Sequence, residues 1–210
     1  MRQKYHPLEM DITTIMTGSE LQTESRNVAP EVVVSTTDIY HGKVVHLRVD
    51  TVQLADGAFS KREIVEHRGA VCIVPVTPQN EVIMVRQYRL AASQELLEIP
   101  AGTLEVGEKP DFCAARELEE ETGLTASTLS PLFSAYLAPG YSTELIHAFL
   151  ATGLETATGD AVPDDDEAIR VDRIPFTDLL DMIENGELKD SKSIAAILAA
   201  ARRLQKTGVL

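Results

Sequence analysis

The sequence lacks tryptophan, and all aromatic residues together make up only 5% of its 210 residues. Its two cysteines, Cys72 and Cys113, are too few for a disulfide framework or a zinc site built from thiolates. Long hydrophobic runs are also missing, so neither a membrane span nor a signal peptide is expected. These absences predict a cytoplasmic protein that does not associate with membranes.

Positive charge is scarce, since 19 Lys and Arg residues stand against 33 Asp and Glu residues and the formal net charge is −14. A chain this acidic is not expected to bind nucleic acid through the phosphate backbone. A small molecule that carries phosphate groups is still compatible with the charge, because bound cations reverse the local sign. The apolar share of 44% is ordinary for a globular domain with a packed core.

Composition divides the chain into three regions. Residues 1–30 are polar and show no period, which predicts a flexible N-terminal arm. Residues 31–68 are rich in β-branched residues and contain the turn signals HG and ADG, which predict a small N-terminal β region. Residues 69–210 mix strand-like and helix-like segments, which predicts an α/β (α+β) domain with helices packed on a mixed sheet.

Within the third region, residues 70–76 and 81–88 predict a pair of strands joined by the turn TPQN. Their nearly continuous apolar character indicates burial on both faces. Residues 96–102 predict a short strand that ends in a loop. Helices are predicted at residues 110–122, 176–186 and 190–205.

The first of these helices carries a run of glutamates. Glu117, Glu120 and Glu121 stand at positions i, i+3 and i+4, so their carboxylates gather on one face of the helix. Each like-charged pair at this spacing costs roughly 0.2–0.5 kcal/mol on an exposed surface. The run is either a solvated acidic face or a site for hard divalent cations, which take oxygen ligands.

The loop before this helix, AGTLEVGEKP, favours the cation site. Gly102 allows unusual backbone torsions and the close approach of a ligand. The carbonyl oxygen of Ala101 would then face the bound metal ions. Glu108 is interpreted either as a surface charge or as a brace for the loop.

Residues 102–124, GTLEVGEKPDFCAARELEEETGL, resemble the Nudix box G-x5-E-x7-R-E-U-x-E-E-x-G-U, in which U is aliphatic. All nine constrained positions match, which makes the resemblance specific. It implies a Nudix α/β/α sandwich and metal-dependent hydrolysis of a nucleoside diphosphate linked to another group. By position, it makes Glu117 and Glu121 the principal metal ligands, with Glu120 and the Ala101 carbonyl as further ligands. The implied cofactor is Mg²⁺, with Mn²⁺ as a substitute.

From about Tyr40 to the C-terminus the chain resembles the ADP-ribose pyrophosphatase subfamily, through segments such as VIMVRQYR, LLEIPAGTLEVGE and LKDSKSIAAILAA. Pro139 lies where ADP-ribose hydrolases carry a proline after the box. The subfamily implies a homodimer in which the N-terminal β region completes the adenine pocket of the partner. Residues 31–66 fit that role.

The resemblance also points to residues that contact the substrate, namely Arg86, Arg89, Glu98 and Tyr40. Arg89 matches the arginine that contacts the pyrophosphate in relatives, and arginine suits phosphate through paired hydrogen bonds. The alternative for Arg89 is a surface ion pair. Glu98 would contact the terminal ribose or a metal ion. Relatives clamp adenine between tryptophans, which this chain lacks, so Tyr40, Phe59 or Tyr88 would stack on the base instead.

The general base in the subfamily comes from an acidic loop after the box. Here that loop is VPDDDEAIRV, in which Glu167 is the first choice and Asp165 and Asp166 are alternatives. Glu144, in the segment PGYSTE, is the second choice. The predicted catalytic residues are therefore Glu167, Glu144 and the box residue Glu120.

The implied reaction is the hydrolysis of ADP-ribose to AMP and ribose 5-phosphate. One alternative is a Nudix enzyme for another nucleoside diphosphate derivative, such as a nucleotide sugar, FAD, NADH or a diadenosine polyphosphate. A second is a Nudix-fold sensor that binds ADP-ribose without cleaving it, and a third is a structural acidic domain. The intact box argues against the sensor.

Overall fold

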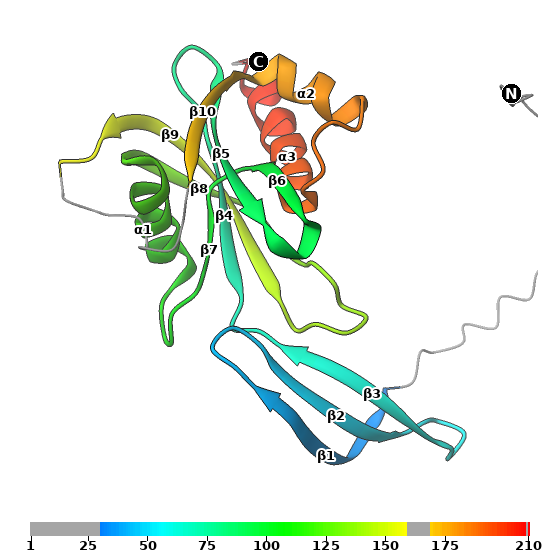
Figure 1. Cartoon of the computed structure of the whole chain (residues 1–210). Helices are drawn as coiled ribbons and strands as arrows, with labels where there is room; N and C mark the ends of the chain where they lie inside the picture. Colours follow the sequence, from blue (N-terminus) through cyan, green and yellow to red (C-terminus); the bar gives the residue numbers. More distant parts are fainter. Residues whose placement is uncertain (1–29, 159–168, 209) are drawn as a thin grey trace, which may run out of the picture.

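In the described part of the chain, the strands form three separate sheets, which Figure 1 shows together with the helices. The computed structural model describes residues 30–158, 169–208 and 210. The elements are β1 (Val32–His41), β2 (His46–Gln53), β3 (Phe59–Glu66), β4 (Ala70–Pro75), β5 (Glu81–Arg89), the 3₁₀ turn η1 (Leu90–Ala92), β6 (Gln94–Glu98), β7 (Ala101–Thr103), α1 (Pro110–Thr122), β8 (Leu124–Tyr136), β9 (Leu145–Thr156), β10 (Arg170–Pro175), α2 (Phe176–Glu184) and α3 (Ser191–Thr207).

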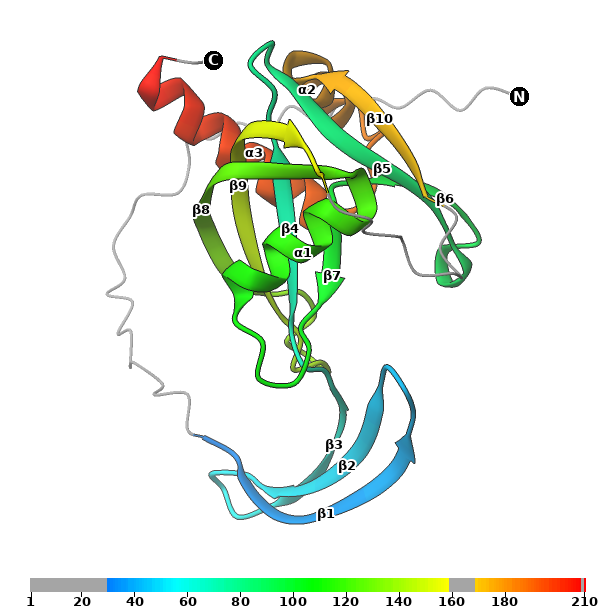
Figure 2. The same cartoon turned by 90° about the vertical axis from the view of Figure 1, so that its left-hand side faces the viewer.

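The central sheet has the strand order β7-β4-β9-β8 and carries helices on both faces. β4 and β9 run parallel, whereas β4–β7 and β8–β9 are antiparallel pairs, so the predicted mixed sheet is confirmed. Side chains alternate along β4. Val71 and Ile73 pack with Leu118 of α1, while Cys72 and Val74 belong to the core formed with α2 and α3. The result is the predicted α/β/α sandwich, which Figures 1 and 2 show from two sides.

The second sheet has the order β10-β5-β6 and is antiparallel. The sequence predicted that β4 and β5 form one strand pair, and this prediction is wrong. An isolated bridge pairs Val76 with Val82 on either side of the turn between β4 and β5. Beyond this bridge the two strands belong to different sheets. β4 is buried throughout and β5 is apolar and buried from Val82 to Val85, and such segments fit many neighbours, so their sequences do not specify a partner.

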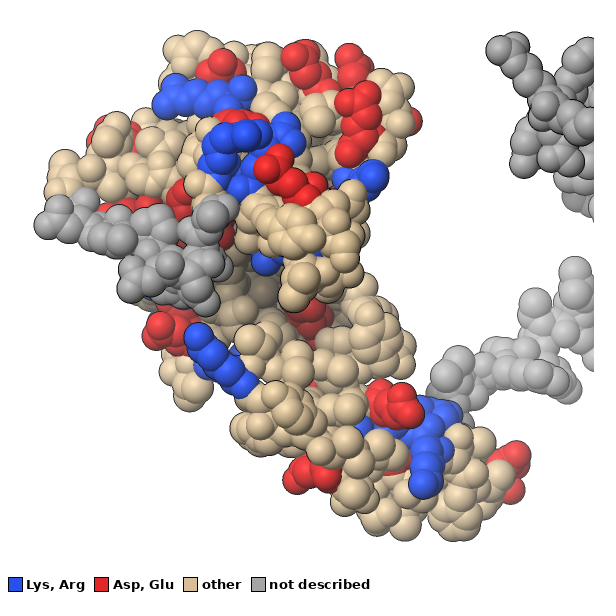
Figure 3. All heavy atoms as spheres, viewed as in Figure 1, with Lys and Arg blue, Asp and Glu red and all other residues tan. Residues whose placement is uncertain are grey.

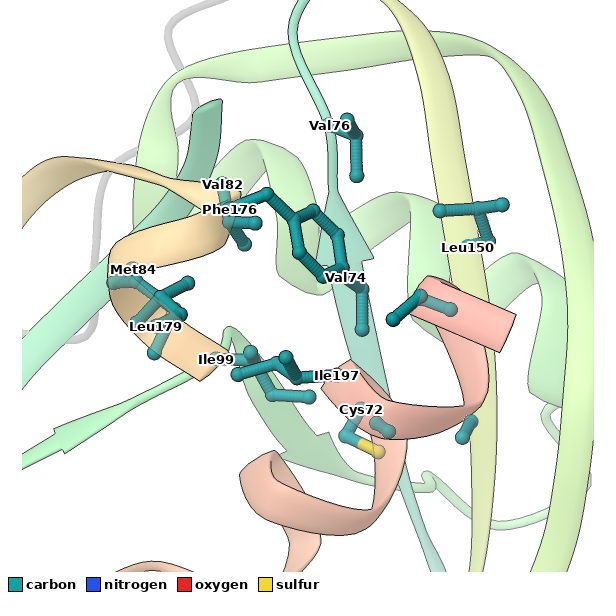
Figure 4. Packing of buried hydrophobic residues seen from close by; sticks show 14 of the residues in the cluster. Cys72, Val74, Val76, Val82, Met84, Ile99, Leu150, Phe176, Leu179 and Ile197 are labelled. Carbon is teal, nitrogen blue, oxygen red and sulfur yellow. The ribbon is translucent and has the colours of Figure 1, made fainter. Parts of the chain in front are cut away.

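Apolar side chains from both sheets and from α2 and α3 form the larger core cluster. Figure 4 shows Phe176 and Leu179 of α2 in this cluster together with Met84, Ile99 and Ile197, all of them buried. Burying a side chain of this kind stabilises the fold by about 1.5–3 kcal/mol. Ile99 lies between β6 and β7, so the cluster also anchors the segment that leads into β7 and the loop before α1.

The ends of α1 and the start of α3 carry sequence signals for helix ends. Pro110 occupies the first turn of α1, and Gly123 ends it in the left-handed conformation at φ 68°, with its N–H donating to the Glu119 carbonyl. The Asp190 side chain caps α3 by accepting a hydrogen bond from the Ser193 N–H. Among the described residues, no helix is both long and apolar enough to cross a membrane.

The N-terminal sheet, β1-β2-β3, lies apart from the helices in both views (Figures 1 and 2). It joins the rest of the chain through β3 and the loop before β9. The Val65 N–H donates to the Tyr141 carbonyl, and the Thr143 N–H donates to the Val65 carbonyl. Every residue of β1 is exposed. The predicted N-terminal arm lies outside the described residues except for Pro30.

Candidate active site

A cavity of about 830 Å³ lies where α1, β7, the β5–β6 hairpin and the start of α3 meet. A volume of this order is typical of small-molecule sites. Seven of the predicted site residues line it: Arg89, Glu98, Ala101, Glu117, Glu120, Glu121 and Glu144. They come from five different segments, so the fold brings together residues that are distant in the sequence.

Charges of both signs line the cavity. Its wall contains seven acidic and five basic side chains, and Figure 3 shows acidic and basic residues mixed on the visible face of the molecule. The acidic excess would repel a diphosphate. The site therefore suits such a ligand only when cations neutralise part of the acidic cluster.

Arg116 ties the loop before α1 to the helix. Its Nε and Nη2 donate to the two carboxylate oxygens of Glu108 at 3.0 and 3.1 Å, and its Nη1 lies 2.8 Å from oxygens of Glu117 and Glu120. Glu108 also accepts a hydrogen bond from the Glu105 N–H at 2.9 Å, which closes the loop. Hydrogen bonds from Arg116 lower the pKa of Glu108 to about 2, and the same bonds raise the pKa of Arg116. These contacts favour the interpretation of Glu108 as a brace.

Gly102 is needed for a steric reason. Its φ lies outside the left-handed region, so the unusual torsions that glycine allows are not the reason. A Cβ atom on Gly102 would lie 1.9 Å from the Cδ and Oε1 atoms of Glu117, far inside contact distance. The glycine therefore lets the Glu117 carboxylate lie against the backbone of β7. On the same strand, the Ala101 N–H donates to Glu121 Oε2 at 3.1 Å.

The donors in this cavity have the chemistry of a divalent-cation site. Three carboxylates from one face of α1 share the cavity with the backbone of β7, and hard cations prefer oxygen ligands. Within the part of the chain that the structure describes, no three acidic, histidine or cysteine side chains converge closely enough to enclose an ion. Arg116 holds Glu117 and Glu120, and Glu121 is bonded to β7. Binding a cation therefore requires the carboxylates to exchange part of these contacts for the ion.

Arg89 holds a buried carboxylate. Its Nε and Nη2 donate to the two oxygens of Glu98 at 2.7 and 2.8 Å. Glu98 is only 1% exposed, and burial acts to raise its pKa, but hydrogen bonds from Arg89 and the charge of Lys192 outweigh burial and lower the pKa. The bonds to Glu98 raise the pKa of Arg89. The ion pair is thus present, and the contacts of Arg89 and Glu98 with substrate stay predictions.

Arg86 and Tyr40 are not among the residues that line the cavity. Side chains alternate along a strand, so Arg86 and Arg89, three positions apart on β5, point to opposite faces. Nε of Arg86 instead donates to Asp172 of β10 at 2.5 Å. Arg86 therefore does not line the cavity that Arg89 lines, and its contact with the substrate stays a prediction. Tyr40 lies on β1 and is 57% exposed. Phe59 and Tyr88, the alternative stacking residues, are exposed to a similar degree.

Two of the predicted catalytic carboxylates lie in the described part of the chain. Glu120 and Glu144 both line the cavity, one from α1 and the other from the loop before β9. Glu167 and its alternatives, Asp165 and Asp166, lie outside the described residues. The assignment of the general base stays a prediction.

Lys192 and Asp190 also line the cavity, although the sequence did not predict them as site residues. Nζ of Lys192 lies 2.5 Å from Glu98 Oε2 and 2.9 Å from Asp190 Oδ2. The sequence predicted only that a helix begins near Asp190. A charged pair before the apolar segment of this helix was the available signal, but only the fold reveals its proximity to Glu98.

Comparison with known proteins agrees with this geometry. Residues 66–197 match the family model described as the NUDIX domain. The ADP-ribose pyrophosphatase of Bacillus subtilis (strain 168) is 42% identical over 167 residues, which cover 80% of this chain and 90% of that protein. The methanol dehydrogenase activator of Bacillus methanolicus is 41% identical over 167 residues, with coverage of 80% and 90%.

A solved crystal structure of an ADP compounds hydrolase matches with a TM-score of 0.78 at 21% identity, over 89% of this chain and 100% of the other. At that identity the likeness concerns the fold alone. The family match covers more than half of the chain, and the matched box forms one wall of the cavity. The protein belongs to the Nudix family.

Proposed function

We propose that the protein is an ADP-ribose pyrophosphatase that, with Mg²⁺, hydrolyses ADP-ribose to AMP and ribose 5-phosphate. The observation that carries this proposal is one cavity that holds the box carboxylates Glu117, Glu120 and Glu121 beside Arg89. The 42% identity to the Bacillus subtilis enzyme supports the choice of substrate. In the reaction, water oxygen bonds to one phosphorus atom, the bridging P–O bond breaks, and a carboxylate takes the proton that water loses.

Four groups would hold the cation: the carboxylates of Glu117, Glu120 and Glu121 and the carbonyl oxygen of Ala101. When bound, Mg²⁺ stabilises negative charge on the diphosphate and lowers the pKa of coordinated water, and Mn²⁺ would substitute for it. Arg116 orients two of the carboxylates. Arg89 uses only part of its N–H donors on Glu98, and the remaining donors bind phosphate oxygens.

Glu167 is our first choice for the general base, and Glu144 is the second. Replacing the true base by glutamine should lower kcat by about 10²–10⁴-fold, the usual contribution of a general base. Mg²⁺ affinity should stay nearly unchanged in that variant. Comparing kcat for Glu167→Gln and Glu144→Gln therefore identifies the general base. A residue whose replacement leaves kcat unchanged is not the base.

We also propose that the protein forms a homodimer, in which the partner's N-terminal sheet completes the adenine pocket and Tyr40 stacks on the base. Two observations support this. Every residue of β1 is exposed, and Lys43 and Val44 of the β1–β2 loop already line the cavity. The N-terminal sheet therefore reaches the substrate site at one end and offers an uncovered strand along its edge.

Product identification tests the proposed reaction. The full chain should convert ADP-ribose to AMP and ribose 5-phosphate with Mg²⁺, and a chelator should abolish the conversion. Glu121→Gln should lose both activity and Mg²⁺ affinity, measured by mass spectrometry and isothermal titration. If ADP-ribose stays intact while a nucleotide sugar, FAD, NADH or a diadenosine polyphosphate is cleaved, the protein is a Nudix hydrolase of another substrate. If it binds ADP-ribose and cleaves nothing, the sensor function replaces the proposal.

A second candidate function comes from the Bacillus methanolicus relative, which is named as a methanol dehydrogenase activator and is 41% identical. This candidate predicts that adding the protein raises the rate of a methanol dehydrogenase. Glu121→Gln serves as the matched variant. An unchanged dehydrogenase rate, with ADP-ribose hydrolysed, excludes this candidate and keeps the first.

A further inference from the structure

We propose that Lys192, on the first turn of α3, is a positioning residue for Arg89 and acts through the Glu98 carboxylate that the two cations share. Arg89 receives the diphosphate only if the protein acts as proposed above, so this role for Lys192 rests on the proposed function. Lys192 itself need not touch the substrate. It fixes the carboxylate against which the Arg89 guanidinium is oriented.

The Glu98 carboxylate is bound on both oxygens. Oε1 accepts from Arg89 Nε at 2.7 Å, and Oε2 accepts from Arg89 Nη2 at 2.8 Å and from Lys192 Nζ at 2.5 Å. The Glu98 side chain is 2% exposed, compared with 41% for Arg89. A buried carboxylate is stable only when its charge is matched and its oxygens are bonded. Lys192, the more buried partner, therefore restricts how the Glu98 side chain can rotate, and Glu98 in turn restricts the rotation of the Arg89 guanidinium.

Lys192 is fixed in turn by a closed ring of hydrogen bonds. Its Nζ lies 2.9 Å from Asp190 Oδ2, and that oxygen also accepts from the N–H and hydroxyl of Ser193. The Ser193 hydroxyl oxygen accepts from the Ile99 N–H at 2.8 Å. Ile99 follows Glu98 directly in the chain. The ring thus connects the N-terminus of α3 to the backbone on which Glu98 stands.

This restriction matters because Arg89 stands at the end of β5, directly before η1, and its side chain is partly exposed. A guanidinium that is free to rotate must be ordered when the diphosphate binds, and that ordering opposes binding and catalysis. A carboxylate held in place by Lys192 orients the guanidinium before the substrate arrives. Removing Lys192 should therefore weaken the contribution of Arg89 while leaving Arg89 itself intact.

A direct contact between Lys192 and the substrate is the competing explanation, because Lys192 also lines the cavity. The two explanations differ in additivity. If Lys192 acts by positioning Arg89, replacing Lys192 should have little further effect on kcat/KM once Arg89 is replaced. If both residues contact the substrate independently, their effects on kcat/KM should multiply. A double-mutant cycle between Lys192 and Arg89 therefore distinguishes them.

The cycle compares kcat/KM for ADP-ribose in Lys192→Met, Arg89→Lys and the double variant. We expect losses of about 10-fold and about 100-fold for the single variants and again about 100-fold for the double variant, because coupled sites are non-additive. A loss near 1,000-fold in the double variant is the additive result and overturns the proposal. Lys192→Arg, which keeps a cation within reach of Glu98, should recover most of the activity. Lys189→Met, which removes an exposed lysine three positions earlier, is the matched control and should stay at the wild-type level.

A second measurement reports the orientation of Arg89 without activity. In ¹⁵N NMR, the Arg89 Nε–H resonance is assigned by its loss in Arg89→Lys. It should be sharp and protected from exchange in the wild type and in Lys189→Met, and broadened or exchanging in Lys192→Met. An unchanged resonance in Lys192→Met overturns the proposal. If Lys192→Met does not fold, Lys192→Gln, which keeps a polar group beside Glu98, takes its place in both experiments. If the wild type leaves ADP-ribose intact, the proposed function fails, and the resonance alone decides whether Lys192 positions Arg89.

Discussion

At the scale of single residues, the contact between Gly102 and Glu117 makes the sharpest steric prediction. Gly102→Ala places a methyl carbon only 1.9 Å from the Glu117 carboxylate, so the carboxylate must move. Because φ at this position is not left-handed, alanine is compatible with the backbone and the fold should persist. The displaced carboxylate should lower kcat by about 100-fold, the typical effect of moving a catalytic group by about 1 Å. Mg²⁺ affinity should fall as well, measured by isothermal titration.

Gly140→Ala is the control for this substitution. A Cβ atom on Gly140 meets nothing within 4 Å, and the residue also lies outside the left-handed region. Its kcat and Mg²⁺ affinity should equal those of the wild type. If Gly102→Ala has the same kcat and Mg²⁺ affinity as Gly140→Ala, the position of the Glu117 carboxylate against β7 is not required for activity or Mg²⁺ binding.

At the scale of elements, the Glu108–Arg116 pair joins the loop before α1 to the helix, and its contribution to stability should depend on pH. Hydrogen bonds from Arg116 lower the folded-state pKa of Glu108 from 4.5 to about 2. A lowered folded-state pKa means that the pair stabilises the fold fully above about pH 4.5 and loses this effect as the pH falls toward 2. The free energy of unfolding of Glu108→Gln should therefore lie below that of the wild type at pH 7, and the gap should narrow between pH 4.5 and 2.

Urea unfolding in a chelating buffer at a series of pH values measures this gap. The control introduces Glu108→Gln into an Arg116→Gln background, where Glu108 has lost the partner that lowers its pKa. There the gap should be small and nearly independent of pH. A gap of constant size in the wild-type background would mean that Glu108 acts through packing and not through its charge.

Element by element, the sequence predicted what is local and missed what depends on partners. The ends of α1 were predictable because Pro110 and Gly123 act within a turn or two of themselves. The spacing of the box glutamates was predictable from the helical repeat for the same reason. The separation of β4 and β5 into two sheets was not, because their apolar sequences fit either sheet.

The site shows the same division. Glu117, Glu120 and Glu121 are neighbours in sequence and reach one cavity together. Lys192 reaches that cavity from a helix that begins far beyond the box, and no local pattern links it to Glu98. A buried Glu98 does require a cation, so the need for a partner was inferable once burial was known, but the identity of the partner was not.

At the scale of the whole molecule, the N-terminal sheet has an uncovered strand along its edge. β1 is exposed at all ten residues, and its side chains include Val34 at 56% and Ile39 at 55% exposure. An exposed strand edge with apolar side chains favours pairing with another chain. The homodimer proposed above would cover this edge, while the loop that contains Lys43 lines the cavity of its own chain.

The homodimer predicts a solution mass of about twice 22.9 kDa by light scattering coupled to gel filtration. A stable interface buries about 800 Å² on each partner, so lysines within it should disrupt the pair. Val34→Lys combined with Ile39→Lys should give a monomer with a raised KM for ADP-ribose, because the adenine end of the substrate loses its cover. The isolated sheet should tolerate the change, since neither side chain is buried. Leu198→Lys, which adds the same charge at an exposed apolar residue of α3, should stay dimeric with an unchanged KM. A wild-type protein that is monomeric and fully active at micromolar concentration would show that the N-terminal sheet has another role.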